Sequence, residues 1–129
     1  PCKVLALDLQ GQIVRVRLQL AGGAVLVSRI TVESAELLGL REALPVLALC
    51  KATAVSANRA TALDAVGAGN LLLGRATRVA RGQSGDEVAA QLDGGLQMVG
   101  FAKAASGLRS GSRVAMTVEE LAVVIALVD

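Results

Sequence analysis

The sequence contains no histidine, tryptophan or tyrosine, and Phe101 is its only aromatic residue. Without histidine, the chain lacks the commonest general base and the commonest metal ligand of proteins. Without more aromatic side chains, it also lacks the platforms on which single-stranded nucleic acid bases stack. These absences argue against histidine-dependent catalysis, against histidine metal sites and against recognition of nucleic acids by stacking.

Charged residues and cysteines are also scarce. Charged residues make up 19% of the 129 residues and hydrophobic residues 53%, so the chain can bury a core. The formal net charge of +2 is too small to indicate binding to a nucleic-acid backbone. Cys2 and Cys50 are predicted to be buried thiols in a reducing compartment, with a disulfide between them as the alternative. No metal site is expected, because no cluster of zinc ligands is present.

Long apolar runs are missing as well. No stretch approaches the roughly 20 apolar residues of a membrane-spanning helix, and no secretory signal opens the sequence. We therefore expect a cytoplasmic protein without membrane association. The chain also begins without methionine, so we expect it to be a processed or excised part of a longer protein.

The hydrophobic pattern predicts mostly β structure. Apolar and polar residues alternate over Ile13–Leu20, which is the period of a half-buried strand. Gly22 and Gly23 then predict a hairpin turn. Further strands are predicted at residues 3–8, 24–30, 46–51, 75–80, 87–92, 96–102, 113–117 and 122–128.

One short helix is expected among these strands. Thr31 is suited to cap its N-terminus, Glu33 to its first turn and Gly39 to its end, which leaves room for about two turns. Residues 58–70 are rich in small residues, with glycine and asparagine near their end, and predict a connector. That connector can include one short helical turn at residues 61–65.

The sequence then repeats itself. The segment at residues 19–23 recurs 72 positions later (19 to 91), and the segment at 39–41 recurs 68 positions later (39 to 107). The second copy is therefore shorter by about one helical turn. The repeat predicts a first domain at residues 1–57, a connector at 58–70 and a second domain at 71–129. The predicted fold class is all-β, with two tandem small OB-like β-barrels, each with a short helix or helix remnant.

The residues give little support to catalysis. A serine or cysteine nucleophile needs a base within hydrogen-bond reach, and no histidine can serve. Glu119 and Glu120 are adjacent carboxylates, but in a strand they would point to opposite faces. The glycines at residues 67–69 and 107–111 lack the lysine of a phosphate-binding loop. We therefore expect a protein that is not an enzyme and has no catalytic residues.

Anion binding is better supported. Thr31 and Ser34 are three residues apart, so they share one face of a helical turn, at a helix start where free N–H groups favour an anion. Lys51 ends an apolar predicted strand and adds a positive charge. Together such donors suit a tetrahedral oxyanion. The alternative is purely structural: Thr31 caps the helix, Ser34 is solvated and Lys51 lies on the surface.

Five arginines lie on predicted strands or at their ends. We interpret them as parts of solvated outer strand faces, or of edges protected by charge, rather than as a DNA-binding surface. They are Arg15, Arg17, Arg75, Arg78 and Arg81.

Two motifs resemble a known family. Residues 30–40 (ITVESAELLGL) resemble the "T-x-E-S-x-x-x-L-G-L" signature of molbindin domains, also called Mop or TOBE-type domains. Residues 46–55 (VLALCKATAV) resemble the terminal strand of that family, "V-x-A-x-I-K-A-S-x-V". The resemblance covers nearly the whole chain as two tandem copies. Through residues 78–82 and 86–88, the second copy is most similar to the paired molbindin domains of ModE-type molybdate-responsive transcription regulators.

The resemblance implies molybdate or tungstate bound at the subunit interface of a homodimer, with no other cofactor. The positions that match the ligands of the family are Thr31, Ser34, Lys51, Ala52 and Thr53. It further implies the effector-sensing part of a molybdate-dependent transcription regulator, which would contact DNA only through a domain outside this chain. The alternatives are a free-standing molbindin for molybdate storage or buffering, and a structural dimerisation module with a decayed anion site.

The second copy departs from the pattern of the family. Lys103 stands where the first copy has Thr31, and Glu119 stands where it has Lys51, so a carboxylate would oppose the anion. The family also supplies an arginine from a motif ahead of the first strand. That motif would precede Pro1 in the first copy, and Gly69 replaces the arginine in the second. We therefore expect only the first copy to build the site, since Ser106 alone is not sufficient for another.

Overall fold

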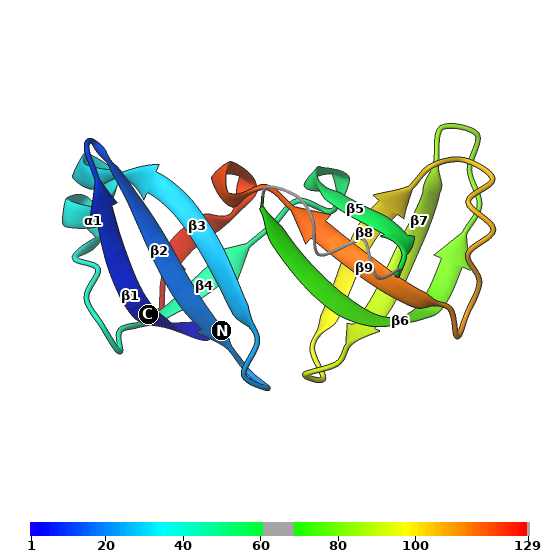
Figure 1. Ribbon diagram of the computed structural model, residues 1–129, viewed down its shortest axis with the longest axis horizontal. Coiled ribbons are helices and arrows are strands. Elements are labelled where there is room, and N and C mark those ends of the chain that lie inside the picture. The colour runs from blue at the N-terminus through cyan, green and yellow to red at the C-terminus, as the bar shows by residue number, and fades with distance from the viewer. Residues whose placement is uncertain (61–68, 129) are drawn as a thin grey trace. The chain divides into compact units, whose positions relative to one another are not determined.

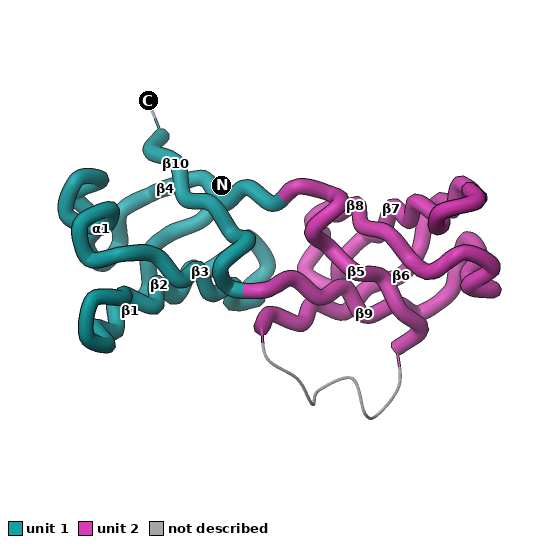
Figure 2. Tube along the Cα trace, turned by 90° about the horizontal axis from the view of Figure 1, so that it is seen from above, with its two compact units in different colours: residues 1–50, 120–129 teal, residues 51–119 magenta. Residues whose placement is uncertain are grey.

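The computed structural model describes residues 1–60 and 69–128. These residues form mostly β-strands, with one α-helix and two short 3-10 turns (Figure 1). The predicted helical turn at residues 61–65, and most of the predicted connector, lie outside the described residues. The described chain divides into two compact units, each coloured separately in Figure 2.

The first unit comprises Pro1–Cys50 and Glu120–Asp129. It contains a five-stranded sheet with the order β10-β4-β1-β2-β3, in which every pair of neighbours is antiparallel. Its strands are β1 (Cys2–Gln10), β2 (Ile13–Leu20), β3 (Val25–Thr31), β4 (Pro45–Leu49) and β10 (Val124–Leu127). The helix α1 (Val32–Leu38) follows β3, and the 3-10 turn η2 (Glu120–Ala122) precedes β10.

The second unit comprises Lys51–Glu119. It forms a closed barrel with the strand order β5-β8-β7-β6-β9. Its strands are β5 (Val55–Arg59), β6 (Asn70–Ala80), β7 (Asp86–Leu92), β8 (Gln97–Ala102) and β9 (Arg113–Val118), and the 3-10 turn η1 (Ala52–Ala54) precedes β5. The predicted all-β class with OB-like units is thus confirmed, although only this barrel is closed by a strand pair between each pair of neighbours.

The last strand of each repeat pairs with strands of the unit that is formed mainly by the other repeat. β5 follows the first repeat in sequence, but it pairs antiparallel with β9 and parallel with β8. β10 ends the second repeat, but it pairs with β4 of the first. The boundaries predicted at residues 57 and 71 describe repeats along the sequence, whereas the compact units change over after Cys50 and after Glu119.

Local sequence patterns account for the individual elements. Along β2, the side chains of Val14, Val16 and Leu18 are buried, which confirms the predicted alternation. α1 begins after Thr31, which caps it, and ends at Gly39, which adopts a left-handed backbone with φ +65°. In the second repeat, residues 103–112 connect β8 to β9 without a helix, so the predicted remnant is a loop there.

Several predicted strand limits were wrong, and the largest error concerns β6, which begins at Asn70 rather than at residue 75. The strand predicted at residues 46–51 ends at Leu49, so Lys51 lies beyond it, where it precedes η1. The connector predicted from residue 58 includes the last two residues of β5. β5 was missed because its partner strands β8 and β9 are distant in sequence, and no local pattern reports such a pairing.

The two units differ at equivalent positions, because only the second unit joins the ends of its sheet by strand pairing. In the second unit, β5 and β8 meet in a parallel bridge between Ser56 and Phe101. Gly100 allows this approach, because a Cβ there would lie 2.8 Å from the Val55 carbonyl oxygen. In the first unit, the repeat places Ser28 at the position of Gly100, and the Ser28 hydroxyl donates a 2.7 Å hydrogen bond to the Val123 carbonyl. A buried side chain therefore joins β3 to the segment ahead of β10.

An ion-pair cluster also holds that segment. Arg15 donates two hydrogen bonds to the Glu120 carboxylate, at 3.0 and 2.8 Å, and Arg29 lies 3.1 Å from the same group. The Glu120 side chain is only 12% exposed, so these contacts are shielded from water. Chiefly through the hydrogen bonds from Arg15, they hold the pKa of Glu120 below its usual value.

Both cysteines are free thiols, as predicted. Cys2 is buried, as predicted, whereas Cys50, which was also predicted to be buried, is half-buried. Burial raises the pKa of each thiol, because the thiolate would lose its hydration. The two side chains therefore stay protonated at neutral pH.

We expect Ser28→Ala to lower the free energy of unfolding by about 1–2 kcal/mol, because it leaves the Val123 carbonyl without its donor in a buried place. Urea denaturation measures this loss. Ser56→Ala is the matched control, since Ser56 is exposed on β5, and its cost should stay within about 0.5 kcal/mol. Equal losses in both variants would contradict the role assigned to Ser28.

We expect Glu120→Gln to cost about 1 kcal/mol of stability at pH 7. The pKa of Glu120 is lower in the folded chain than its ordinary 4.5. Its contribution is therefore complete above pH 4.5 and is lost as the pH falls through the folded-state pKa. Denaturation at pH 7 and at pH 3 measures the gap to wild type, which should shrink at pH 3. Glu42→Gln, an exposed glutamate outside the cluster, should show no such gap.

Candidate functional site

The start of α1 arranges two hydroxyl groups. The Thr31 hydroxyl oxygen accepts a hydrogen bond from the Ser34 N–H at 3.1 Å and donates one to the Ser34 hydroxyl oxygen at 2.9 Å. This fixes the two side chains against each other on the exposed side of the turn. Because Thr31 donates its own proton to Ser34, the Ser34 hydroxyl proton points to an acceptor other than Thr31. The pair can therefore cap the helix and still present one hydroxyl donor.

The turn η1 arranges a second group of donors. Lys51 precedes the turn and is exposed, and the first hydrogen bond of the turn runs from the Ala54 N–H to the Lys51 carbonyl at 2.9 Å. The N–H groups of Ala52 and Thr53 lie ahead of that bond, and no side chain caps them. An ammonium group and two backbone N–H groups on three consecutive residues form a donor set suited to an anion.

The five predicted ligands thus fall into two groups on two elements. Thr31 and Ser34 belong to the first compact unit, and Lys51, Ala52 and Thr53 belong to the second. All are exposed except Ala52, which is half-buried. Their role as anion ligands stays a prediction, but each group has the donor chemistry on which that prediction rests.

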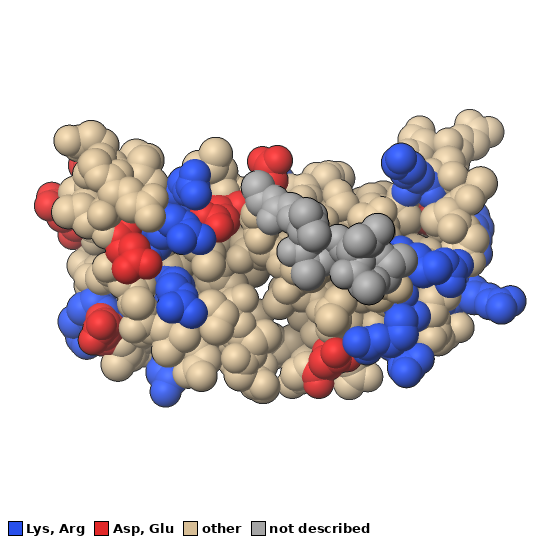
Figure 3. Space-filling model, in the orientation of Figure 1, with Lys and Arg blue, Asp and Glu red and all other residues tan. Residues whose placement is uncertain are grey.

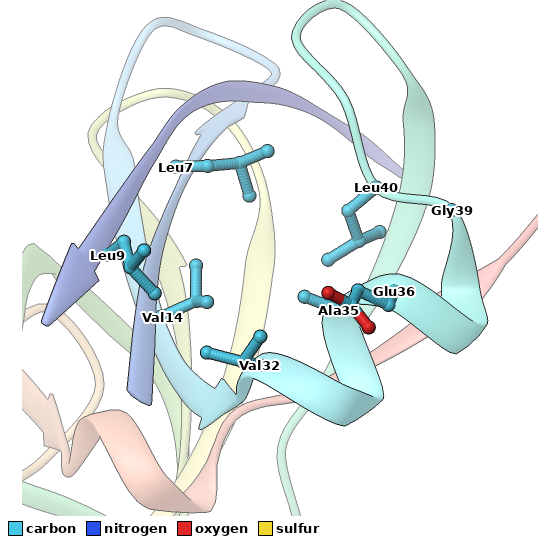
Figure 4. Close-up of a pocket in the computed structure, with 8 residues that line it drawn as sticks. All are labelled: Leu7, Leu9, Val14, Val32, Ala35, Glu36, Gly39 and Leu40. Carbon is cyan, nitrogen blue, oxygen red and sulfur yellow. The ribbon is translucent and has the colours of Figure 1, made fainter. Parts of the chain in front are cut away.

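A small cavity lies between α1 and the ends of β1 and β2 (Figure 4). Its volume is about 280 Å³, and its lining is apolar except at Glu36. The lining residues are Leu7, Leu9, Val14, Val32, Ala35, Glu36, Gly39 and Leu40. A cavity with this lining does not suit an oxyanion, since it offers an acidic group and no basic side chain.

The second repeat has a polar cluster instead, centred on Asp86. The Asp86 side chain is 1% exposed, and its Oδ2 accepts hydrogen bonds from Arg81 at 2.9 Å and from the Ser106 hydroxyl at 2.7 Å. The backbone N–H groups of Ser106 and Gly82 also point to this carboxylate, at 3.3 and 3.4 Å. Arg81 further donates to the Leu108 carbonyl. The hydrogen bonds, the one from the Ser106 hydroxyl first, hold the pKa of Asp86 below its usual value despite burial.

Sequence reasoning missed this cluster. Arg81 was interpreted as part of a solvated strand face and as a mark of family resemblance, Asp86 only as such a mark, and Ser106 only as an insufficient ligand. The repeat itself carried the signal, because it aligns Arg81 with Leu9 and Asp86 with Val14. An arginine and an aspartate that replace two apolar residues at paired strand positions indicate an ion pair.

The other departures of the second repeat also have structural counterparts. Gly69 adopts φ +110°, and a Cβ there would lie 3.0 Å from the Val118 carbonyl oxygen, so an arginine could not replace it without strain. Lys103 and Glu119 are both exposed. The second repeat therefore lacks the helix and the lysine of the first, and its backbone disfavours the arginine of the family.

Several arginines have partners within the chain. Arg15 binds Glu120, Arg81 binds Asp86, and Arg75 donates to the Gly111 carbonyl at 3.2 Å. Arg17 and Arg78 are exposed. On the face shown in Figure 3, basic and acidic groups are mixed over the first unit, and basic groups predominate over the second.

Residues 1–60 and 69–128 lack two further features, a cluster of metal ligands and a membrane-spanning helix. No three cysteine, aspartate or glutamate side chains there come together in a way that could hold a metal ion. No helix in the same residues has both the length and the apolar character needed to cross a membrane.

Comparisons with known proteins bear on the first repeat and on the whole fold. Residues 1–57 match the family model of the TOBE domain. A crystal structure of the cytoplasmic molybdate-binding protein ModG, with molybdate bound, matches the chain with a TM-score of 0.90 and 25% sequence identity. That match covers 98% of this chain and 93% of the ModG chain. No curated protein sequence matches the chain.

We expect Thr31→Ala to lower the free energy of unfolding by about 1 kcal/mol, because it removes the cap of α1. Thr31→Ser keeps the hydroxyl and should retain most of that stability. Urea denaturation of the two variants without any added anion measures the difference. Equal stability of both variants would show that the hydroxyl does not cap the helix.

Proposed function

Residues 1–57 match the TOBE domain family, and on that premise we propose that this protein binds molybdate or tungstate. The observation that carries the proposal is the match to the molybdate-bound ModG structure over nearly the full length of both chains. The ligands are the two donor groups described above. They are Thr31, Ser34, Lys51, Ala52 and Thr53.

The chemistry of these donors supports an oxyanion. Molybdate and tungstate are tetrahedral dianions that accept several hydrogen bonds. Ser34 supplies a hydroxyl donor, Lys51 a positive charge, and Ala52 and Thr53 backbone N–H groups with no acceptor in their turn. Thr31 orients Ser34 through the 2.9 Å hydrogen bond between their hydroxyls. Donors fixed by backbone geometry select an anion by size, and both anions are larger than sulfate.

The proposal includes a homodimer with the anion at its subunit interface. Its support is the family resemblance and the exposure of both donor groups, which leaves them accessible to a second chain. An anion held by two chains contributes to their association, because each chain alone offers it fewer hydrogen bonds. The role is binding rather than catalysis, and the proposed location is the cytoplasm, as for ModG.

Two physiological roles fit such binding. The first is effector sensing within a molybdate-dependent transcription regulator, where the anion would shift the population of a linked DNA-binding domain outside this chain. The second is storage or buffering by a free-standing protein. The ModG match favours the second, since the matched region makes up 93% of that chain. Resemblance of the second repeat to regulators favours the first. Molybdate-dependent DNA binding by the natural full-length protein would decide between them.

Isothermal titration calorimetry with molybdate tests the proposed site. We expect saturable binding to the wild type, no binding of sulfate, and a loss of affinity of tenfold or more, about 1.4 kcal/mol, in Lys51→Ala. Ser34→Ala should also bind more weakly. Lys103→Ala is the matched control, because Lys103 is an exposed lysine at the position in the second repeat that corresponds to Thr31.

Each alternative gives a different result. Equal losses in Lys51→Ala and Lys103→Ala would indicate nonspecific charge attraction and contradict the assigned site. No heat with either anion would favour a structural module with a decayed site. The mass in solution, measured with and without molybdate, tests the homodimer separately, and a monomer under both conditions would contradict it.

A further inference from the structure

The Asp86 carboxylate is held as a bound anion would be held. Three donors of different kinds converge on its Oδ2: the Arg81 guanidinium, the Ser106 hydroxyl and the Ser106 N–H. The Gly82 N–H points to Oδ1. The side chain is 1% exposed, so the charge is removed from water and depends on these donors.

The repeat relates this cluster to the start of α1. Ser106 occupies the position of Ser34, 72 residues later (34 to 106). In the first repeat, the Ser34 N–H bonds to the Thr31 hydroxyl within the helix start. In the second repeat, the helix is absent, and both the N–H and the hydroxyl of Ser106 turn to the Asp86 carboxylate. Ser106 thus has the same position in its repeat as Ser34, but its N–H and hydroxyl groups both bond to a carboxylate.

We propose that Arg81, Gly82 and Ser106 form a built anion site in the second repeat, and that Asp86 fills it as a tethered ligand. The site is suited to a small carboxylate of one negative charge, because it offers one guanidinium and a planar group already fits its donors. This assignment does not depend on molybdate binding by the first repeat. It explains in physical terms why Ser106 is unavailable to an external oxyanion.

The exposed ion pair between Asp93 and Arg113 provides a contrast in the same unit. Its N–O distances are short, at 2.6 and 3.0 Å, but the Asp93 side chain is 58% exposed, and among the described residues no backbone N–H or hydroxyl donor points to its carboxylate. Asp93 is therefore one half of a surface salt bridge, whereas Asp86 is enclosed by donors from three residues. A free anion should be able to replace Asp86 but should gain little at Asp93.

Replacement of the carboxylate by a free one tests the proposal. Asp86→Ala in the full chain removes the tethered anion and leaves its donors, and sodium formate is the probe. We expect the Tm of Asp86→Ala to rise by about 5 °C at formate tenfold above its Kd, relative to sodium chloride at equal ionic strength. Wild type and Asp93→Ala should show no rise specific to formate. Addition of Ser106→Ala to Asp86→Ala should reduce the formate effect.

The outcomes separate the proposal from its rivals. A rise confined to Asp86→Ala supports it, and an equal rise in Asp93→Ala, or no rise in either variant, overturns it. If Asp86→Ala does not fold in chloride, refolding from urea in formate gives the same readout. Recovery of folded protein in formate alone then supports the site, and failure in both salts overturns it. Wild-type molybdate binding can fail or succeed without changing any of these results.

Discussion

The exchange of the last strands is the constraint on which the structure depends. β5 completes the barrel of the second unit, and β10 extends the sheet of the first. Each compact unit therefore takes most of its strands from one repeat and one strand from the other repeat. The contacts around β10 show how strongly this segment is held. Ser28 donates to the Val123 carbonyl, and Arg15 and Arg29 enclose the Glu120 carboxylate. The Ser28 contact lies where the second unit has the strand bridge between β5 and β8.

The two repeats have different side chains at the end of the equivalent hairpin, apolar in the first repeat and charged in the second. At the end of the β1–β2 hairpin, Leu9 and Val14 line an apolar cavity that α1 borders. At the matching end of the β6–β7 hairpin, Arg81 and Asp86 form the centre of a hydrogen-bonded cluster. This repeat has a loop in place of the helix. A carboxylate needs donors when it is buried, and the loop that replaces the helix supplies them through Ser106. Ser34 is thus exposed at the start of α1, whereas Ser106 at the equivalent position of the second repeat is bonded to a carboxylate of its own chain.

Much of this fold is encoded locally and could be predicted from sequence. The alternation in β2, the glycine turns and the Thr31 cap of α1 each depend on neighbouring residues. Two features depend on residues that only the fold brings together, so no local pattern revealed them. They are the pairing of β5 with β9 and the contact between Asp86 and Ser106. The donor chemistry of Lys51 was predicted, but its placement at the start of a 3-10 turn rather than in a strand was not.

Strand exchange also has a consequence for how such a chain assembles. A chain with a single repeat would carry a last strand that it does not use itself, and two copies would have to meet to complete each other. Joining the copies turns that encounter into an event within one molecule, at an effective concentration set by the connecting segment rather than by the amount of protein. The same arrangement slows folding, because Leu49 must pair with Val124, which is distant in the sequence. Pairings between residues that are far apart in the sequence form slowly.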